Sequence, residues 1–213
     1  MYVLAMLSML VDHAGLMFDA DQELWRIIGR FAMPIYAYCL VQAYKHTRSK
    51  PKYMIRLGLI AAVTQLPYYV ALNKPQINIV ATFLICFMVL IVLKRLRKKW
   101  MRFGVVAVTF VLLELVPLEY GGYALLLILI FRYLKLHAVF LAHVLLNSVF
   151  LFYKGWTTQV FSFMPTVLIM YGPSILKAVD RVKISRWIWR TFYPAHLIVL
   201  AAIKLWRGGG AYF

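Results

Sequence analysis

The sequence predicts an all-α polytopic membrane protein, a transmembrane helical bundle of about nine spans. Hydrophobic residues make up 64% of the 213 positions, whereas roughly 45–50% of a soluble domain is apolar. The mean hydropathy is +0.78. A helix needs about 20 apolar residues to cross a bilayer, and such runs follow one another along the chain. These observations exclude a soluble globular class and predict one integral membrane domain over residues 1–213.

The apolar runs define the expected spans in chain order. They cover residues 2–18, 25–44, 54–72, 77–94, 103–117, 121–136, 138–153, 157–176 and 187–206. The fifth to seventh runs are short, so a count of eight or ten stays open. Strongly basic breaks such as 45–56 and 94–102 alternate with breaks of low or negative charge such as 18–23 and 117–122. Since basic loops stay in the cytoplasm, the N-terminus is expected inside and the C-terminal RGGGAYF outside.

The net charge of +17 has two readings. Basic patches bind nucleic acid in soluble proteins, but here Lys and Arg occupy the breaks between apolar runs, where they set topology and meet anionic lipid. We therefore expect membrane lipid, and no nucleic acid, as a partner. Cys39 and Cys86 lie within apolar runs without CxxC spacing, so neither a disulfide framework nor a metal site is predicted.

Ionisable residues inside the apolar runs mark the candidate site. Asp12 and His13 stand side by side in SMLVDHAGLM, and Arg30 in the second run falls at a similar depth. A charged side chain inside the membrane costs about 2.5–3.5 kcal/mol on insertion scales, so it normally faces the bundle interior and a partner. A structural ion pair is the simpler alternative, but three ionisable groups at one depth are a poor arrangement for stability alone.

Further polar residues collect on other spans. On the second run, Tyr38, Gln42 and His46 follow Arg30 and Pro34 at four-residue steps along one helix row. The third, fourth and last runs add Gln65, Tyr68, Asn78, Thr82, Tyr193 and His196. For Tyr193 and His196, and for His137 and His143, hydrogen bonding between helices is the alternative to a functional role.

This arrangement suits acid–base chemistry. A histidine beside a carboxylate can act as general base, although neighbouring helix positions point about 100° apart. Arg30 could hold a carboxylate or stabilise developing negative charge. The chain has no GxSxG, HExxH or Walker sequence. The site would therefore activate the nucleophile of a substrate, an amine or a hydroxyl, toward an acyl donor.

The blocks that carry these residues resemble a known family. SMLVDHAG, WRIIGRFAMPIYAYCLVQAYKHTR, YMIRLGLIAAVTQLPYYVAL, INIVATFL and FYPAHLIVL resemble the TraX family of integral membrane proteins, whose namesake is the F-pilin acetylase. The resemblance implies a multi-pass protein of the bacterial cytoplasmic membrane. It also implies N-acetylation of a membrane-associated or extracytoplasmic acceptor, such as a peptide N-terminus, with cytoplasmic acetyl coenzyme A as donor.

The resemblance and the residue pattern together assign roles. His13 is the expected general base, Asp12 its orienting partner, and Arg30 a stabiliser of charge. The coenzyme is expected on the basic face and the second-run row, at Lys45, His46, Arg48, Tyr38 and Gln42. Substrate or oxyanion contacts are expected from Gln65, Tyr68, Asn78, Thr82, Tyr193 and His196.

Two other functions stay open, as does the oligomeric state, for which a homo-oligomer is one option. Intramembrane Asp, His and Arg also build the substrate paths of transporters and flippases. A non-catalytic assembly factor of a conjugation or secretion system is the third reading. Substrate flux without covalent change would favour a transporter.

Overall fold

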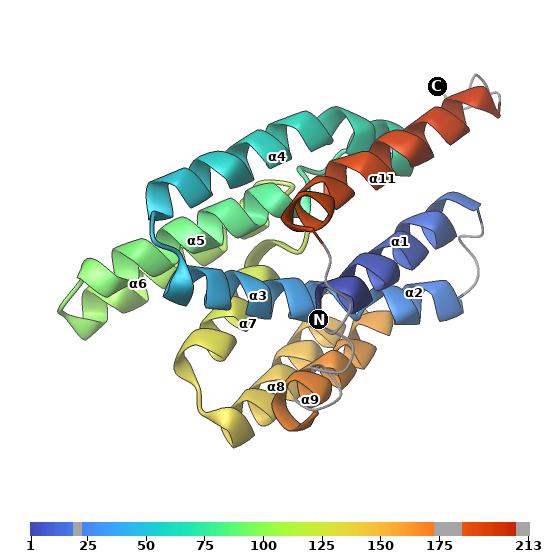
Figure 1. Cartoon of the computed structure of the whole chain (residues 1–213). Helices are drawn as coiled ribbons and strands as arrows, with labels where there is room; N and C mark the ends of the chain where they lie inside the picture. The colour runs from blue at the N-terminus through green and yellow to red at the C-terminus, as the bar shows by residue number, and fades with distance from the viewer. Residues whose placement is uncertain (19–22, 173–184, 208–213) are drawn as a thin grey trace.

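The computed structural model describes residues 1–18, 23–172 and 185–207, and these form helices and connecting loops without a strand (Figure 1). The helices are α1 Tyr2–Phe18, α2 Glu23–Gly29, α3 Ala32–His46, α4 Lys50–Leu72, α5 Ile79–Arg95, α6 Lys99–Leu115, α7 Gly121–Tyr133, α8 Leu136–Lys154, the 3-10 helix η1 Thr158–Ser162, α9 Phe163–Tyr171 and α11 Arg186–Trp206. Each predicted apolar run coincides with a helix or a consecutive pair, so the all-α prediction is confirmed. The end of the run at 157–176 and most of RGGGAYF lie outside the described residues.

The second predicted span is divided into α2 and α3 at Arg30 and Phe31. Pro34 has no N–H to offer the carbonyl of Arg30, and in a continuous helix its ring would clash with that carbonyl. The backbone N–H of Arg30 still donates to the carbonyl of Arg26 at 3.1 Å, which completes α2. At this break Arg30 bonds Asp12 of α1, and Gly29 lies against the same residue.

A pair of loops is joined at one end of the bundle. The backbone N–H of Ile77, between α4 and α5, donates to the carbonyl of Pro117 at 2.8 Å, and the N–H of Glu119 donates to the carbonyl of Ile77 at 2.9 Å. Tyr120 follows with a left-handed backbone, at φ 62°. A non-glycine residue in that region is uncommon, and here it directs the Tyr120 side chain toward α2.

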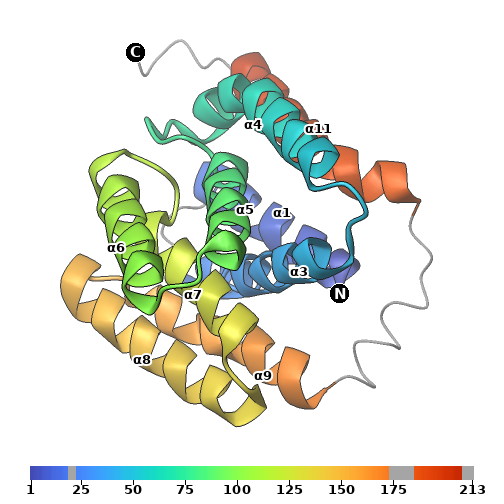
Figure 2. The same cartoon turned by 90° about the vertical axis from the view of Figure 1, so that its left-hand side faces the viewer.

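The helices are arranged around two buried clusters of apolar side chains. One cluster is formed mainly by α3, α5, α7 and α8, and the other mainly by α1, α4 and α11, with Ala32 of α3 and Val80 of α5. In Figure 2 the α4 and α11 pair lies at one end of the molecule and α8 with α9 at the other, with α1, α3, α5 and α7 between them. The polar residues of α1 and α2 therefore lie where the two clusters meet.

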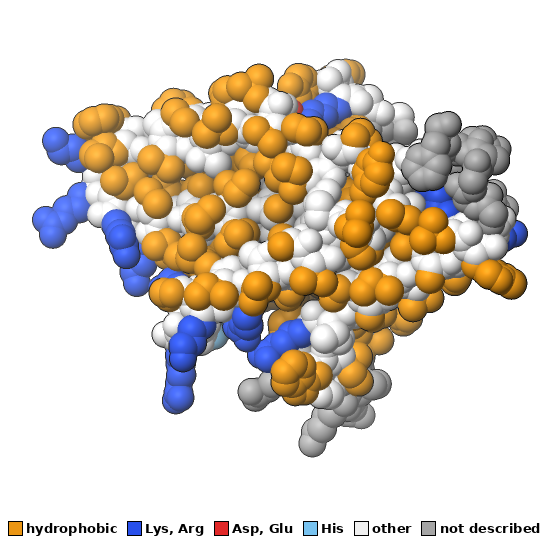
Figure 3. All heavy atoms as spheres, turned by 90° about the horizontal axis from the view of Figure 1, so that it is seen from above, with side chains coloured by type: hydrophobic (Ala, Val, Ile, Leu, Met, Phe, Trp, Pro, Cys, Tyr) orange, Lys and Arg blue, Asp and Glu red, His pale blue; other side chains and the backbone are white. Residues whose placement is uncertain are grey.

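The outer surface is apolar, as expected for a protein in lipid. Large apolar side chains point outward, including Phe152 at 88% exposed, Phe103 at 76% and Leu66 at 71%. Figure 3 shows apolar side chains spread over one face, with Lys and Arg mostly at its edges. Within the described residues, three helical stretches are long and apolar enough to cross a membrane: residues 23–46, 50–72 and 137–154. The chain is thus a membrane protein, while the count of nine spans stays a prediction.

Candidate functional site

Asp12 is held by two arginines of α2 and its C-terminal turn. Its Oδ1 accepts a hydrogen bond from Arg26 Nη1 at 3.0 Å and another from Arg30 Nη2 at 3.1 Å. Such charge-assisted bonds are about twice as strong as neutral ones. Gly29 makes this approach geometrically allowed, because a Cβ atom there would lie 2.3 Å from Asp12 Cβ and from Asp12 Oδ1. A glycine between the two arginines is therefore part of the site.

Arg30 connects four elements. Its Nε donates to the Arg26 carbonyl at 3.1 Å, and its Nη1 donates to the Tyr120 hydroxyl at 3.0 Å and to Gln159 Oε1 at 3.3 Å. With the bond to Asp12, four of its five N–H donors are engaged. Arg30 does hold a carboxylate, but that carboxylate belongs to Asp12. Its contacts fix α1, α2, the Tyr120 loop and η1 relative to one another.

His13 faces a second histidine instead of Asp12. His13 Nδ1 and His196 Nε2 are 2.8 Å apart, and His196 Nδ1 lies 2.7 Å from the carbonyl oxygen of Phe192. A carbonyl oxygen only accepts, so His196 Nδ1 carries a proton. In a neutral pair its Nε2 then accepts, which places a proton on His13 Nδ1 and leaves the lone pair on His13 Nε2. Asp12, the predicted orienting partner of His13, instead bonds Arg26 and Arg30, while His13 Nδ1 meets His196 across the interface of α1 and α11.

Tyr193 lies on α11 near this pair. Its ring centroid is 6.5 Å from that of His13 and 5.7 Å from that of His196. Its hydroxyl is buried and has no hydrogen-bond partner within the described part of the chain. A buried hydroxyl without a partner is costly, so this donor is available for a group that enters the cavity beside it.

Three of the predicted substrate residues are used by the fold. Asn78 Oδ1 accepts from the N–H groups of Val80 and Ala81 and so caps α5, and Asn78 Nδ2 donates to Gln65 Oε1 at 2.8 Å. Thr82 Oγ1 donates to the Glu119 carbonyl at 2.9 Å. These bonds clamp α4, α5 and the loop of Glu119 together. Gln65, Asn78 and Thr82 thus hold these elements in place next to the site. Tyr68 is fully buried.

Three cavities with shared walls run through the bundle, and we name them by position. The α11 cavity has a volume of about 120 Å³, the central cavity about 40 Å³ and the loop cavity about 430 Å³. The α11 and central cavities share Met9, Tyr36, Ile79, Phe83 and Tyr193. The central and loop cavities share Asp12, Glu119 and Tyr120.

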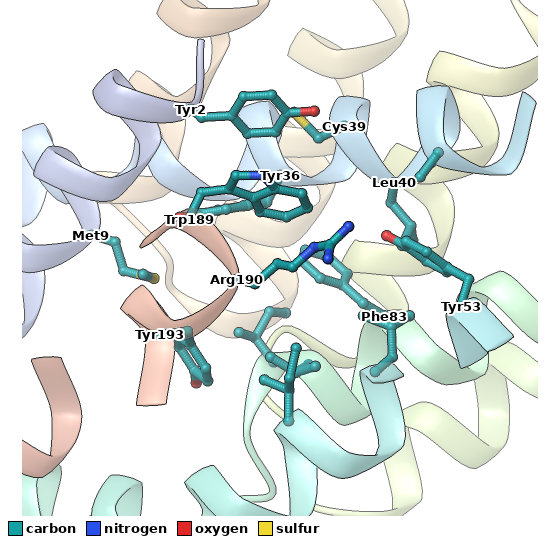
Figure 4. Close-up of a pocket in the computed structure, with 15 residues that line it drawn as sticks. Tyr2, Met9, Tyr36, Cys39, Leu40, Tyr53, Phe83, Trp189, Arg190 and Tyr193 are labelled. Carbon is teal, nitrogen blue, oxygen red and sulfur yellow. The ribbon is translucent and has the colours of Figure 1, made fainter. Parts of the chain in front are cut away.

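His13 lines the central cavity, which shares wall residues with each of the other two cavities. The α11 cavity reaches Tyr2, Ala43 and Trp189, close to the basic breaks of the sequence, as Figure 4 shows for Tyr2 and Trp189. The loop cavity reaches Lys74 and Thr157 at the opposite end of the helices. A basic side chain between the α11 cavity and the loop cavity could react with two ligands that enter from opposite ends of the helices.

The residues predicted to bind the coenzyme lie elsewhere. Lys45, His46 and Arg48 are exposed at the connection of α3 and α4. Tyr38 packs edge-on against Phe131 of α7, at 5.8 Å between ring centroids. The face of α3 toward the α11 cavity consists of a different set, namely Tyr36, Cys39, Leu40 and Ala43. The predicted row of Tyr38, Gln42 and His46 therefore follows the neighbouring face of the helix.

Sequence reasoning missed four residues of the site: Arg26, Glu119, Tyr120 and Gln159. Burial raises the pKa of the Glu119 carboxyl, and nearby Lys74 opposes that rise. The signal for this loop was an acidic residue directly before an aromatic residue and two glycines, in PLEYGG. Within the described residues, no three His, Cys, Asp or Glu side chains are grouped to hold a metal ion.

Comparisons with known proteins place the chain in a family. A probable fimbrial assembly protein, FimC of serogroup H1, from Dichelobacter nodosus is 34% identical over 71 residues, which is 32% of this chain and 29% of that protein. The chain thus matches less than a third of that relative's length. No solved structure matches the chain. The profile described as TraX protein matches residues 1–204, and the chain therefore belongs to the TraX family.

Proposed function

We propose that this protein transfers an acetyl group from a thioester donor to an amine of an acceptor that approaches from the opposite side of the membrane. The observation that carries the proposal is the position of His13, between the α11 cavity and the loop cavity. Since basic loops mark the cytoplasmic side, the α11 cavity would admit cytoplasmic acetyl coenzyme A. The acceptor would enter through the loop cavity of a protein in the bacterial cytoplasmic membrane.

His13 supports the proposal as the general base. The hydrogen bonds to His196 and on to the Phe192 carbonyl favour the tautomer with a lone pair on Nε2. Fixing the tautomer of a catalytic histidine is the task of the third group in acid–base triads. We infer that the neutral His196 imidazole performs it here, while the Asp12 carboxylate pairs with Arg26 and Arg30 and offsets one of their two positive charges.

The transfer step uses these groups in sequence. The amine nitrogen attacks the thioester carbonyl carbon, a C–N bond forms, and the amine proton passes to His13 Nε2. The Tyr193 hydroxyl donates a hydrogen bond to the developing oxyanion, the type of interaction that often dominates acyl transfer. The C–S bond then breaks, and the proton moves from His13 to the departing sulfur. An acetamide and a free thiol result.

The identity of the acceptor is suggested by the family and by the matched relative. The relative from Dichelobacter nodosus is named a probable fimbrial assembly protein, and the family is known for pilin acetylation. A subunit of a surface fibre, or another membrane-associated peptide with a free N-terminus, fits an approach through the loop cavity. The polar lining of that cavity, with Arg26, Lys74, Gln76 and Thr158 among others, suits a hydrated peptide end.

A transporter is the second candidate, because cavities that share walls from end to end also describe a transport path. Detergent-purified protein with radiolabelled acetyl coenzyme A and a panel of amines and hydroxyl compounds separates the two. Acyl transfer predicts label bound covalently to an acceptor in solution, where no gradient exists. Folded wild-type protein that neither transfers nor hydrolyses the acetyl group would refute the enzyme and favour flux in sealed vesicles.

A further inference from the structure

Among the described residues that line the α11 cavity, Arg190 is the charged one. Arg190 extends from the first turns of α11 into the cavity, between the rings of Tyr36 and Trp189 on one side and Phe83 on the other (Figure 4). The other lining residues are apolar, aromatic or cysteine. A mostly apolar channel with a single cation selects a long, weakly polar ligand that carries an anionic group at one point.

Arg190 is placed unusually for an arginine near a helix end. Such residues normally extend along the helix and keep the guanidinium in the interfacial water. Here the Nε atom is buried and finds no hydrogen-bond partner among the described residues, and the guanidinium carbon lies 5.8 Å from the Trp189 ring centroid. A buried N–H group left without a partner is expensive, so an incoming acceptor group would be favoured.

The spacing of residues along α11 places Arg190 close to the proposed reacting groups. Tyr193 and His196 follow Arg190 by three and six residues, which is about 4.5 Å and 9 Å along the helix axis. Tyr193 belongs to the walls of both the α11 and the central cavity. A ligand anchored at Arg190 would therefore extend along α11 toward His196 and toward the Tyr193 hydroxyl, which has no partner within the described part of the chain.

We propose that Arg190 binds the phosphate of a phosphopantetheine arm, whose acylated sulfur reaches the central cavity. The arm of such a thioester carrier is flexible and only weakly polar, and it ends in a phosphate, which matches the channel and its cation. Arginine suits phosphate because its planar fork can form two parallel bonds. The proposal deepens the proposed acetyl transfer and rests on it, and it replaces the exposed Lys45, His46 and Arg48 as the anchor of the donor.

The phosphate of a phospholipid is a second group that Arg190 could bind. A groove of about 470 Å³ adjoins the α11 cavity between α4 and α11, and both share Tyr53, Leu57 and Arg190. Leu59 and Val63 on its edge are 61% and 60% exposed, so a lipid could enter from the bilayer. The thioester carrier is favoured because the cavity that contains Arg190 shares Tyr36 and Tyr193 with the central cavity, which His13 lines.

The test compares 4′-phosphopantetheine with pantetheine, which lacks the phosphate, by calorimetric titration of the protein in phosphatidylcholine nanodiscs. The phosphate should tighten binding to wild type about 10- to 100-fold, as for hydrogen bonds to a charged group. In Arg190→Gln this preference should vanish, and Arg190→Lys should retain part of it. Arg132→Gln is the matched control, because the Arg132 Nε is likewise buried without a partner in the described residues yet faces the Tyr44 ring.

Several results would overturn the assignment. They are equal binding of both ligands to wild type, a phosphate preference that survives in folded Arg190→Gln, or its loss in Arg132→Gln. Replacing the lipid with phosphatidylglycerol tests the other source: if it abolishes phosphopantetheine binding to wild type, Arg190 is a lipid site. Acetyl transfer is measured in parallel. Binding through Arg190 without any transfer would refute only the proposed function, whereas transfer with an unchanged KM for acetyl coenzyme A in Arg190→Gln would refute only the anchor.

Discussion

Two polar clusters, each built around buried histidines, differ in how completely their polar groups are paired. The first contains His13 and His196, and the second contains His143. In the second cluster, His143 of α8 bonds through Nε2 to the Tyr123 hydroxyl at 2.9 Å and through Nδ1 to Thr166 Oγ1 at 2.7 Å. Asn147 and Ser162 complete it, with Tyr123 2.8 Å from Asn147 Oδ1 and 3.1 Å from Ser162 Oγ. All five side chains are at most 2% exposed, and none lines the three cavities of the candidate site.

The first cluster has the opposite properties. His13 and His196 are paired, but the buried Tyr193 hydroxyl has no hydrogen-bond partner among the described residues, and the side chains of His13 and Tyr193 line the central cavity. The difference separates structure from function: a saturated network without a cavity stabilises the packing of helices, whereas an open site beside a cavity retains donors and acceptors for a ligand. For His143 and His137 the contacts match the alternative of hydrogen bonding between helices, with His137 Nδ1 3.1 Å from the Tyr171 hydroxyl.

Replacing the two histidines should give the largest contrast. His13→Gln removes the basic Nε2 and should lower kcat for acetyl transfer by about 10²- to 10⁴-fold, the usual contribution of a general base, with little change in Tm. His143→Gln should leave kcat within a few-fold and lower the free energy of unfolding by about 1–3 kcal/mol, because buried partners lose their bonds. Initial rates and thermal unfolding in detergent measure both. Full turnover of His13→Gln would remove His13 from the mechanism.

Removing one hydroxyl from each cluster, at Tyr193 and at Tyr123, tests the same difference between the two clusters. Tyr193→Phe removes a hydroxyl that bonds no described residue, so stability should hold or rise, while kcat falls about 10²-fold through the lost oxyanion donor. Tyr123→Phe removes a hydroxyl with three partners and should cost about 1–3 kcal/mol of unfolding free energy with nearly normal kcat. The opposite pattern, a stable Tyr123→Phe and an unstable but active Tyr193→Phe, would reverse the assignment of the two clusters.

Two glycines give the smallest expected effects and test the geometry of the first cluster. Gly29→Ala places a methyl group against Asp12 and should cost about 1–3 kcal/mol of unfolding free energy through overpacking, together with part of the activity. Gly104→Ala on α6 is the matched control, because a Cβ there meets nothing within 4 Å. It should stabilise the protein by about 0.4–1 kcal/mol. If both variants unfold alike, the close contact of α1 and α2 is not needed.

The fold was largely accessible from the sequence, because span positions depend on local composition. The apolar runs mark the helices, and Pro34 and Gly29 mark the break beside Arg30. The pairing of Asp12 with Arg30 could also be predicted, since charges buried in lipid must find partners. Depth along a helix needs only residue counting.

The side-chain contacts within the site could not be predicted from the sequence in the same way. His13 and His196 are 183 residues apart, and their contact depends on how α1 packs against α11. The choice between the row of Tyr38 and Gln42 and the face of Tyr36 and Leu40 depends on the rotation of α3, which small packing differences decide. A left-handed Tyr120 in a short loop leaves no periodic signal at all.

Transfer across a sealed membrane tests the central claim most directly. Proteoliposomes with uniformly oriented protein would hold acetyl coenzyme A on the side of the basic loops and an impermeant peptide amine on the other side. The account predicts acetylated peptide with the wild type, and a rate at least about 10²-fold lower with His13→Gln. Acetylation that occurs only when donor and acceptor share one compartment would contradict a base that lies between two opposite cavities.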